Sequence, residues 1–380
     1  MKYKTNSLNC LADIQTGPFG SQLHNEDYVL EGTPIVTVEH LGEKNFKKQN
    51  LPFVSDADKE RLSKYVLKTG DIVFSRVGSV DRCSYVSAKY DGWLFSGRCL
   101  RVRPNETLDP QYLYYYFCAE ETKQFVRNIA VGATMPSINT ALLGQVQISY
   151  PDIITQKKIA AILSALDEKI ATNRAINENL QQQAQALYKS WFVDFEPFGG
   201  TAPSDWKSYH LADFLPVITG KKNANVSSDK GLYPFFSCSQ DYAWTDEYSF
   251  DGSAILVAGN GDFNVKFYCG KFEAYQRTYV LIPYTPRYTA WLFYAVQYNL
   301  SIITSAARGS VIKFITKGNL EDFEFMAPHD PDQLPVIDTL SAINNQIAAN
   351  NDENLKLAEL RDSLLPKLMS GEIDVSDVQI

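Results

Sequence analysis

The sequence is poor in cysteine and histidine and has no long apolar run. No window of its 380 residues approaches the ~20 continuous apolar residues of a membrane span, and its first ten residues, MKYKTNSLNC, lack the apolar stretch of a secretory signal. The six cysteines include no CxxC pair, and none of the four histidines has a companion at metal-ligand spacing. These absences predict a chain with reduced thiols in the cytoplasm, without a disulfide framework and without a metal site.

The common catalytic motifs are also missing. There is no GxxxxGK[ST] phosphate loop, no GxGxxG between a strand and a helix, no HExxH and no GxSxG. Carboxylates such as Asp71 and Asp81 lie beside expected turns, where they are typical of caps or surface groups. We therefore expect no catalytic residue in this chain.

Negative charge is concentrated at one end of the chain. The net charge is −8, but residues 329–380 alone hold 3 Lys and Arg against 10 Asp and Glu, a balance of −7. The rest of the chain is close to neutral, so each globular region can carry a basic face, whereas the acidic end suits solvent or a basic protein partner.

The chain contains an internal duplication. At an offset of 177 residues, Leu163-Ser164-Ala165 matches Leu340-Ser341-Ala342 and Pro151 matches Pro328; at an offset of 203, Thr16-Gly17 matches Thr219-Gly220. The duplication predicts four segments: globular regions over 1–150 and 198–328, and long helices over 151–197 and 329–380, the last including the acidic tail.

Both helical segments carry a heptad seam, with apolar residues and asparagines in steps of four and three. The first seam runs from Ile159 to Trp191, about 50 Å at ~1.5 Å per residue. Pro366 interrupts the second pattern and is expected to kink or end that helix near its last turn.

The asparagines of the two seams favour an antiparallel coiled coil. Centred at residues 175 and 352, this pairing sets Asn173 opposite Asn354 and Asn177 opposite Asn350, so that each amide can bond another and fix the register. A parallel pair also aligns the amides but requires the second globular region to run back along the whole helix. A further alternative packs each seam on its own globular region.

The globular regions combine short strands with one helix each. Strands are expected at 35–38, 71–74, 93–95, 99–103, 254–257, 265–268 and 277–282. Helices are expected near 109–129 and 287–305. The predicted fold is therefore α+β, a pseudo-two-fold internal repeat of two α+β regions separated by two long helices in an antiparallel coiled coil.

Several ordered segments resemble the specificity (S) subunits of type I restriction–modification systems. They are Thr16-Gly17-Pro18-Phe19-Gly20-Ser21-Gln22-Leu23, Gly70-Asp71-Ile72-Val73, Gly132-Ala133-Thr134-Met135-Pro136-Ser137-Ile138, Gln156-Lys157-Lys158-Ile159-Ala160, Leu187-Tyr188-Lys189-Ser190-Trp191-Phe192-Val193-Asp194-Phe195 and Leu364-Leu365-Pro366-Lys367-Leu368-Met369-Ser370-Gly371-Glu372-Ile373. The resemblance covers nearly the whole chain.

The resemblance implies that the globular regions are target recognition domains, that the helices are spacers and that the subunit has no active site. It implies assembly with two methyltransferase (M) subunits and with restriction (R) subunits, on double-stranded DNA with a bipartite site. S-adenosylmethionine is then expected in the M subunit, and ATP and magnesium in the R subunit, with no cofactor in this chain.

Polar and basic residues beside the expected turns are the candidates for DNA contact, since Arg and amide side chains can pair with base edges and Lys with phosphate. The candidates are Ser21, Gln22, Lys44, Lys47, Lys48, Arg76, Ser79, Arg82, Lys221, Lys222, Asn223, Asn260, Asn264, Lys266 and Arg308. For each of them a solvated side chain is the alternative. Arg101 and Arg103 share one strand face and fit either role, whereas the tyrosines of 112–116 are expected in the core.

Aromatic residues gather at the end of the first long helix. Tyr188, Trp191, Phe192 and Phe195 are predicted to dock a partner, and contacts with the neighbouring globular region are the alternative. Other functions stay open at this point: a coiled-coil scaffold that binds proteins but no DNA, or a nuclease or methyltransferase, against which the missing motifs argue.

Overall fold

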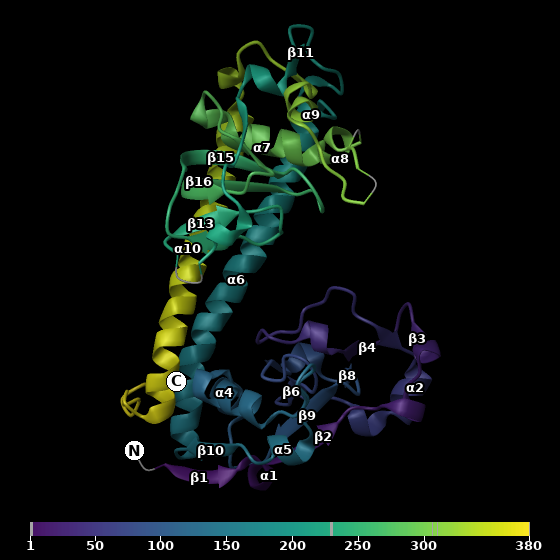
Figure 1. Ribbon diagram of the computed structural model, residues 1–380, viewed down its shortest axis with the longest axis vertical. Coiled ribbons are helices and arrows are strands. Elements are labelled where there is room, and N and C mark those ends of the chain that lie inside the picture. The colour runs from purple at the N-terminus through teal and green to yellow at the C-terminus, as the bar shows by residue number, and fades with distance from the viewer. Residues whose placement is uncertain (1–2, 229–230, 306, 310, 380) are drawn as a thin grey trace. The chain divides into compact units, whose positions relative to one another are not determined.

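The computed structural model describes residues 3–228, 231–305, 307–309 and 311–379, with only the backbone for Ser21 and Asn25. Its contacts divide the chain into two compact units. Unit 1 consists of Met1–Ala171 and Leu355–Ile380, and unit 2 of Thr172–Asn354. Each unit therefore combines one globular region with a part of each long helix (Figure 1).

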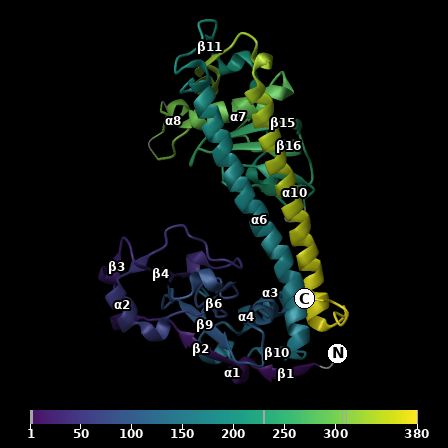
Figure 2. The ribbon, with the colours of Figure 1, turned by 180° about the vertical axis from the view of Figure 1, so that it is seen from behind.

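The two long helices are α6, Ile153–Phe192, and α10, Pro335–Ser370. Asp152 caps α6, because its Oδ1 accepts hydrogen bonds from the backbone N–H groups of Ile154 and Thr155, both at 3.0 Å. The hydroxyl of Thr155 also donates to Asp152, and these bonds lower the pKa of its carboxyl. Within each unit the helices run side by side and antiparallel (Figure 2), as the seam predicts.

Asparagine amides join the two helices inside unit 2. Asn173 Nδ2 donates to Asn354 Oδ1 at 3.0 Å and to Glu353 Oε2 at 2.7 Å. Asn350 Nδ2 donates to Asn177 Oδ1 at 2.7 Å. Asn173 is 1% exposed and Asn177 is 7% exposed, so both amides are bonded away from water. These are the two pairs expected from the seam, and their role in fixing the register stays a prediction.

Pro366 lies inside α10, and the helix ends four residues later at Ser370. Of the two expected outcomes, the helix does not end at Pro366 itself, and a kink there stays a prediction. Leu365, Leu368 and Met369 are buried in the core of unit 1 around it. Packing on both sides of the proline thus offsets the loss of one backbone hydrogen bond.

The globular region of unit 1 is built from three small sheets. In order along each sheet, the strands pair as β1-β10, as β2-β9-β6-β7 and as β3-β5-β4-β8. Most pairs are antiparallel, and β4 with β8 is parallel. The strand bounds are β1 Lys4–Ser7, β2 Ala12–Thr16, β3 Tyr28–Val29, β4 Thr33–Val36, β5 Phe53–Val54, β6 Ile72–Ser75, β7 Cys83–Tyr85, β8 Leu94–Phe95, β9 Cys99–Pro104 and β10 Gln147–Tyr150.

The globular region of unit 2 repeats this plan with merged sheets. Its strands pair as β11-β18 and as β12-β17-β15-β16-β13-β14. The long strand β16 pairs antiparallel with β15 and parallel with β13. It therefore takes the places that two separate strands, β7 and β8, occupy in unit 1. The strand bounds are β11 Lys207–His210, β12 Val217–Thr219, β13 Tyr233–Phe236, β14 Ala243–Thr245, β15 Phe250–Ala258, β16 Val265–Ala274, β17 Thr278–Leu281 and β18 Glu324–Ala327.

Short helices pack on these sheets. They are α1 Leu8–Leu11, α2 Asp56–Arg61, α3 Pro110–Cys118, α4 Glu120–Ile129 and α5 Thr140–Leu143 in unit 1, and α7 Thr289–Tyr298, α8 Leu300–Ile303 and α9 Lys317–Glu321 in unit 2. Each single helix expected from the sequence is therefore divided in two, α3 with α4 and α7 with α8. The α+β class and the mixed sheets are confirmed.

Each globular region is fastened to the long helices through a tyrosine. In unit 1, Tyr115 donates from its hydroxyl to Asp167 of α6 at 2.6 Å. In unit 2, Tyr294 donates to Asn344 of α10 at 2.6 Å. Asp167 and Asn344 match at the offset of 177 residues, so the duplication preserves this contact as well as the strands.

The asparagine pairs lead to a prediction for stability. Asn173→Leu leaves the Asn354 amide facing a methyl group across the seam, which costs about 1–3 kcal/mol. Combining it with Asn354→Leu restores an apolar contact, so we expect the double variant to regain most of the free energy of unfolding. Chemical denaturation of the full chain measures the free energy of unfolding of the single and the double variant. Asn179→Leu, on the exposed side of α6, is the control. Strict additivity of the two substitutions would refute the pairing.

Candidate nucleic-acid interface

The first loop at this site follows β2 in unit 1 and β12 in unit 2. It begins with a glycine that touches a neighbouring main chain. A Cβ atom on Gly17 would lie 2.2 Å from the Ser96 carbonyl oxygen, and one on Gly220 would lie 2.0 Å from the Ala274 carbonyl oxygen. No side chain fits at either place, so the matching Thr-Gly pairs reflect one structural constraint used twice.

The second loop joins β6 to β7 in unit 1 and β15 to β16 in unit 2. The same main-chain hydrogen bond closes it in both units. Ser75 N–H donates to the Arg82 carbonyl at 2.9 Å, and Ala258 N–H donates to the Asn264 carbonyl at 2.9 Å. Arg82 and Asn264 therefore occupy equivalent positions in the two units.

The third loop is a hairpin that precedes α5 in unit 1 and α9 in unit 2. Val131 pairs with Ser137, and Arg308 pairs with Phe314 at the offset of 177 residues. The glycine after the first residue of each pair has a positive φ, +112° in unit 1 and +105° in unit 2. L-residues rarely adopt this backbone, which explains a glycine at both positions.

Hydrogen bonds join the third loop to the second. Gly78 N–H donates to the Pro136 carbonyl at 2.8 Å, and Gly261 N–H donates to the Lys313 carbonyl at 3.1 Å. The loops of each unit thus form one surface with the turn before β9 or β17, and we call it the loop face. It comprises residues 17–22, 76–82, 96–98 and 131–137 of unit 1 and residues 220–226, 259–264, 275–277, 308–309 and 311–314 of unit 2.

The loop face of unit 1 brings together most of the candidates predicted there. Arg76 donates to the Gly97 carbonyl at 3.3 Å and lies 5.9 Å from the ring centre of Phe19. Gln22 accepts a hydrogen bond from the Tyr65 hydroxyl at 2.6 Å. The remaining candidates here are Ser79 and Arg82, which are exposed, and Ser21, whose side chain lies outside the described part of the structure.

The loop face of unit 2 holds its candidates in a similar way. Lys221, Asn223 and Arg308 are exposed, and Asn260 is partly buried. Lys222 forms an ion pair with Glu247 at 3.0 Å. Ion pairing does not prevent contact with DNA, but it competes with phosphate for the ammonium group.

Two further candidates of unit 2, Asn264 and Lys266, form hydrogen bonds within the protein. The Asn264 Nδ2 donates to the Cys238 carbonyl at 3.0 Å. Lys266 donates to the Ser239 carbonyl and to Asn264 Oδ1, both at 2.5 Å, and burial lowers the pKa of Lys266. Both side chains brace the loop between β15 and β16.

Lys44 lies outside the loop face. Its ammonium group donates to the hydroxyls of Tyr115 and Ser164, both at 3.0 Å, and burial lowers its pKa. The structure thus places Lys44 in a packing contact with α6, whereas the sequence predicted a contact with DNA. Lys47 and Lys48 lie a few residues along the same segment and are exposed.

The two arginines of β9 act within the protein. Arg101 is 3% exposed and forms an ion pair with Asp13. Arg103 binds both carboxylate oxygens of buried Asp71, at 2.6 and 2.7 Å, and this contact raises its pKa. The sequence left open whether these arginines contact DNA or act within the protein, and the structure shows both in ion pairs within the protein.

The aromatic residues at the end of α6 lie against the globular region of unit 2. Tyr188 and Phe192 are buried, and Phe192 packs on Trp206 with ring centres 5.6 Å apart. Phe195 also contacts Trp206, at 5.8 Å. Contact with the globular region was the alternative to partner docking. Trp191, partly exposed, packs on the neighbouring Phe198 ring, and docking through these residues stays a prediction.

Sequence reasoning missed two arginines of the loop face, Arg98 and Arg277. Both side chains are exposed. They differ by 179 residues, the same offset as Cys99 and Thr278 that follow them. Aligning the turns before these strands, and not only the longer matches, would have found them.

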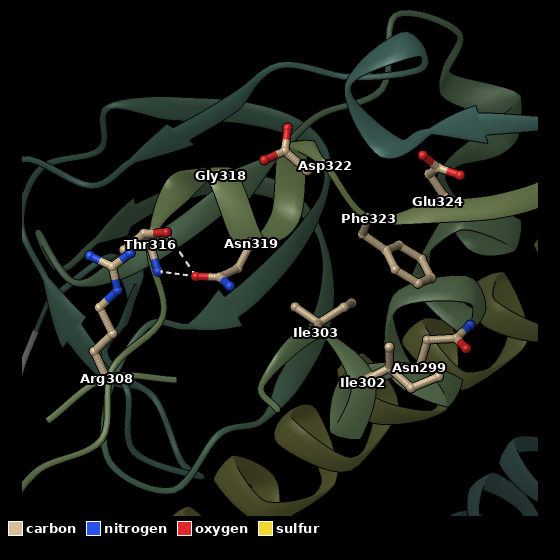
Figure 3. A pocket seen from close by; sticks show the side chains of 10 residues that line it. All are labelled: Asn299, Ile302, Ile303, Arg308, Thr316, Gly318, Asn319, Asp322, Phe323 and Glu324. Carbon is tan, nitrogen blue, oxygen red and sulfur yellow. Dashed lines mark hydrogen bonds between the residues drawn. The ribbon is translucent and has the colours of Figure 1, made fainter. Parts of the chain in front are cut away.

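A cavity of about 620 Å³ lies beside the third loop of unit 2 (Figure 3). Arg308, Ile303 and Asn319 are among the residues that line it. The Asn319 Oδ1 accepts hydrogen bonds from the N–H of Thr316 at 2.8 Å and from its hydroxyl at 2.7 Å, so these polar groups cap α9.

Other kinds of site find no support in the described residues. Among them, no three His, Cys, Asp or Glu side chains gather where a metal ion could bind. None of the helices they form combines the length and apolar character of a membrane span. The loop face is therefore the surface on which a functional interpretation rests.

These features define a class of protein in which two related α+β regions, each with its own loop face, are built on one antiparallel helix pair. The family described as "Type I restriction modification DNA specificity domain" matches residues 2–182 and 203–359. The chain belongs to this family, and the resemblance seen in the sequence is confirmed.

Individual relatives agree with this assignment. The chain is 35% identical over 178 residues to the specificity subunit of the type I restriction enzyme EcoDI of Escherichia coli, over 46% of this chain and 40% of that protein. It is 27% identical over 386 residues to a putative MjaX specificity subunit of Methanocaldococcus jannaschii, over 92% of this chain and 89% of that protein. The first match thus spans well under two thirds of the relative.

A solved structure shares the fold. The S subunit of a type I restriction–modification system from M. genitalium superimposes with a TM-score of 0.65 at 16% identity, over 97% of this chain and 96% of that chain. At this identity the likeness concerns the fold alone.

The environment of Lys44 leads to a prediction that separates packing from DNA contact. Lys44→Met removes two partly buried hydrogen bonds, and we expect a loss of about 1–3 kcal/mol in the free energy of unfolding. The matched control is Lys47→Ala, an exposed lysine of the same segment, which should change it by less than about 0.5 kcal/mol. Equal stability of the two variants in urea denaturation would contradict the packing role.

Proposed function

We propose that this chain is the DNA-recognition subunit of a type I restriction–modification complex. Each loop face contacts one part of a bipartite DNA site, and the paired helices form the spacer between the two contacts. The chain contributes no catalytic group of its own.

The observation that supports this proposal most strongly is one loop scaffold that carries different side chains in the two units. The main-chain bonds that close and join the loops are the same. At equivalent positions, however, Arg82 is replaced by Asn264, and Val131 by Arg308. Arg and Asn form different pairs with base edges, so two such faces are suited to two different base sequences.

The proposal includes partners that perform the chemistry. Two methyltransferase subunits dock on the repeated parts of the chain, since a two-fold repeat offers the same surface twice, and restriction subunits join for cleavage. S-adenosylmethionine then belongs to the methyltransferase, and ATP and magnesium to the restriction subunit. The acidic segment 329–380 is suited to a basic surface of such a partner.

Arg76 provides the test of this function. In the complex assembled with its methyltransferase, DNA affinity should fall linearly with the logarithm of salt concentration, because phosphate contacts release counterions. Arg76→Ala should lower the affinity by roughly ten-fold and relax the base preference in one half-site only. Lys4→Ala, an exposed basic residue on β1, serves as control.

One result would contradict the function, and another would contradict the role given to Arg76. If the assembled complex bound duplex DNA with no dependence on salt, or did not bind it at all, the chain would be a coiled-coil scaffold for proteins. If Arg76→Ala left both affinity and preference unchanged, Arg76 would be removed from the interface.

A further inference from the structure

Arg98 and Arg277 hold the same place in the two units. The Arg98 carbonyl accepts a hydrogen bond from Arg76 N–H at 2.8 Å, and the Arg277 carbonyl accepts one from Gly259 N–H at 2.8 Å. The carbonyl of the next residue along the chain accepts a hydrogen bond from the glycine that begins the first loop, from Gly17 N–H at 3.2 Å in unit 1 and from Gly220 N–H at 3.1 Å in unit 2. The backbone thus fixes both arginines where the first and second loops meet.

Both guanidinium groups are available for a ligand. The two side chains are exposed. Within the described ranges of the chain, no side-chain hydrogen bond or ion pair engages either of them, whereas Arg101 and Arg103, three and five residues after Arg98, are both bonded to carboxylates. A guanidinium presents five N–H donors in a planar fork that matches the oxygens of a phosphate.

The comparison of the two loop faces indicates what these arginines contact. Other basic positions differ between the units: Gly259 replaces Arg76, and Asn264 replaces Arg82. Residues that differ are suited to the bases, which differ between two parts of a DNA site. A residue that is the same in both faces is suited to the part of DNA that is the same everywhere, the phosphate backbone.

We propose that Arg98 and Arg277 each bind a DNA phosphate and position their loop face on the duplex without specifying its sequence. This inference rests on the proposed function and adds to it a division of roles. Arg98 and Arg277 act as positioning residues in equivalent places, while the unlike residues around them contact the bases.

The experiment uses the full chain assembled with its methyltransferase subunits. The variants are Arg98→Ala, Arg277→Ala and the double variant, with Lys4→Ala and Lys207→Ala as matched controls, since these two lysines are also equivalent and exposed. Affinity is measured over a range of salt concentrations on a duplex with the methylated site and on an unrelated duplex. Because both arginines are exposed, the thermal midpoints of all variants should equal that of the unaltered chain.

Each single variant should weaken binding to both duplexes by the same factor, roughly ten-fold. It should also lower the slope of log affinity against log salt by about 0.9, the value for one phosphate contact, and the double variant by about twice that. The methylated sequence should not change.

Three results would overturn the inference. Variants with unaltered affinity and slope would show that neither arginine contacts DNA. A changed base preference in one half-site would show that the arginines specify sequence. If the unaltered complex did not bind DNA, the proposed function and this inference would fail together, whereas the first two results leave the proposed function intact.

Discussion

Hydrogen bonds between asparagine amides of α6 and α10 are the constraint on which the rest of the structure depends. Asn173 with Asn354 and Asn177 with Asn350 occupy seam positions where Leu or Ile would bind more strongly. A shifted register would leave such an amide unpaired, so we predict that these pairs fix the register of the two helices. The register would in turn determine which residues of each helix meet the globular regions, where Asp167 and Asn344 accept the tyrosine hydroxyls that fasten those regions.

Duplication then gives the chain two versions of one surface. The glycines at 17 and 220 admit no side chain, and the hairpins after residues 131 and 308 depend on a positive φ at the same position. These constraints hold the backbone of the loop face constant while the side chains that it presents can vary. Under the proposed function, a scaffold of this kind could change the bases recognised by one unit without altering the other, which fits a family whose description names DNA specificity.

The sequence predicts the repeated and periodic parts of this architecture well. Heptad spacing locates α6 and α10 to within a few residues. The seam asparagines predict the register, and the antiparallel direction follows because a parallel pair would require the second globular region to run back along the whole helix. Sequence cannot show that Pro366 lies inside a helix, since core packing around it decides the outcome. Nor can it separate Lys44, bonded to Tyr115 and Ser164, from the exposed Lys47. Both are lysines beside turns, and only long-range packing distinguishes them.

The measurement that tests the account most directly is a map of the methylated positions in DNA from cells that carry this chain with its methyltransferase, before and after residues 198–328 are exchanged for the corresponding region of another family member. The account predicts a sequence of two specified parts with a fixed unspecified gap, of which only one part changes after the exchange. A single uninterrupted sequence, or a change in both parts, would contradict the division of recognition between two independent loop faces.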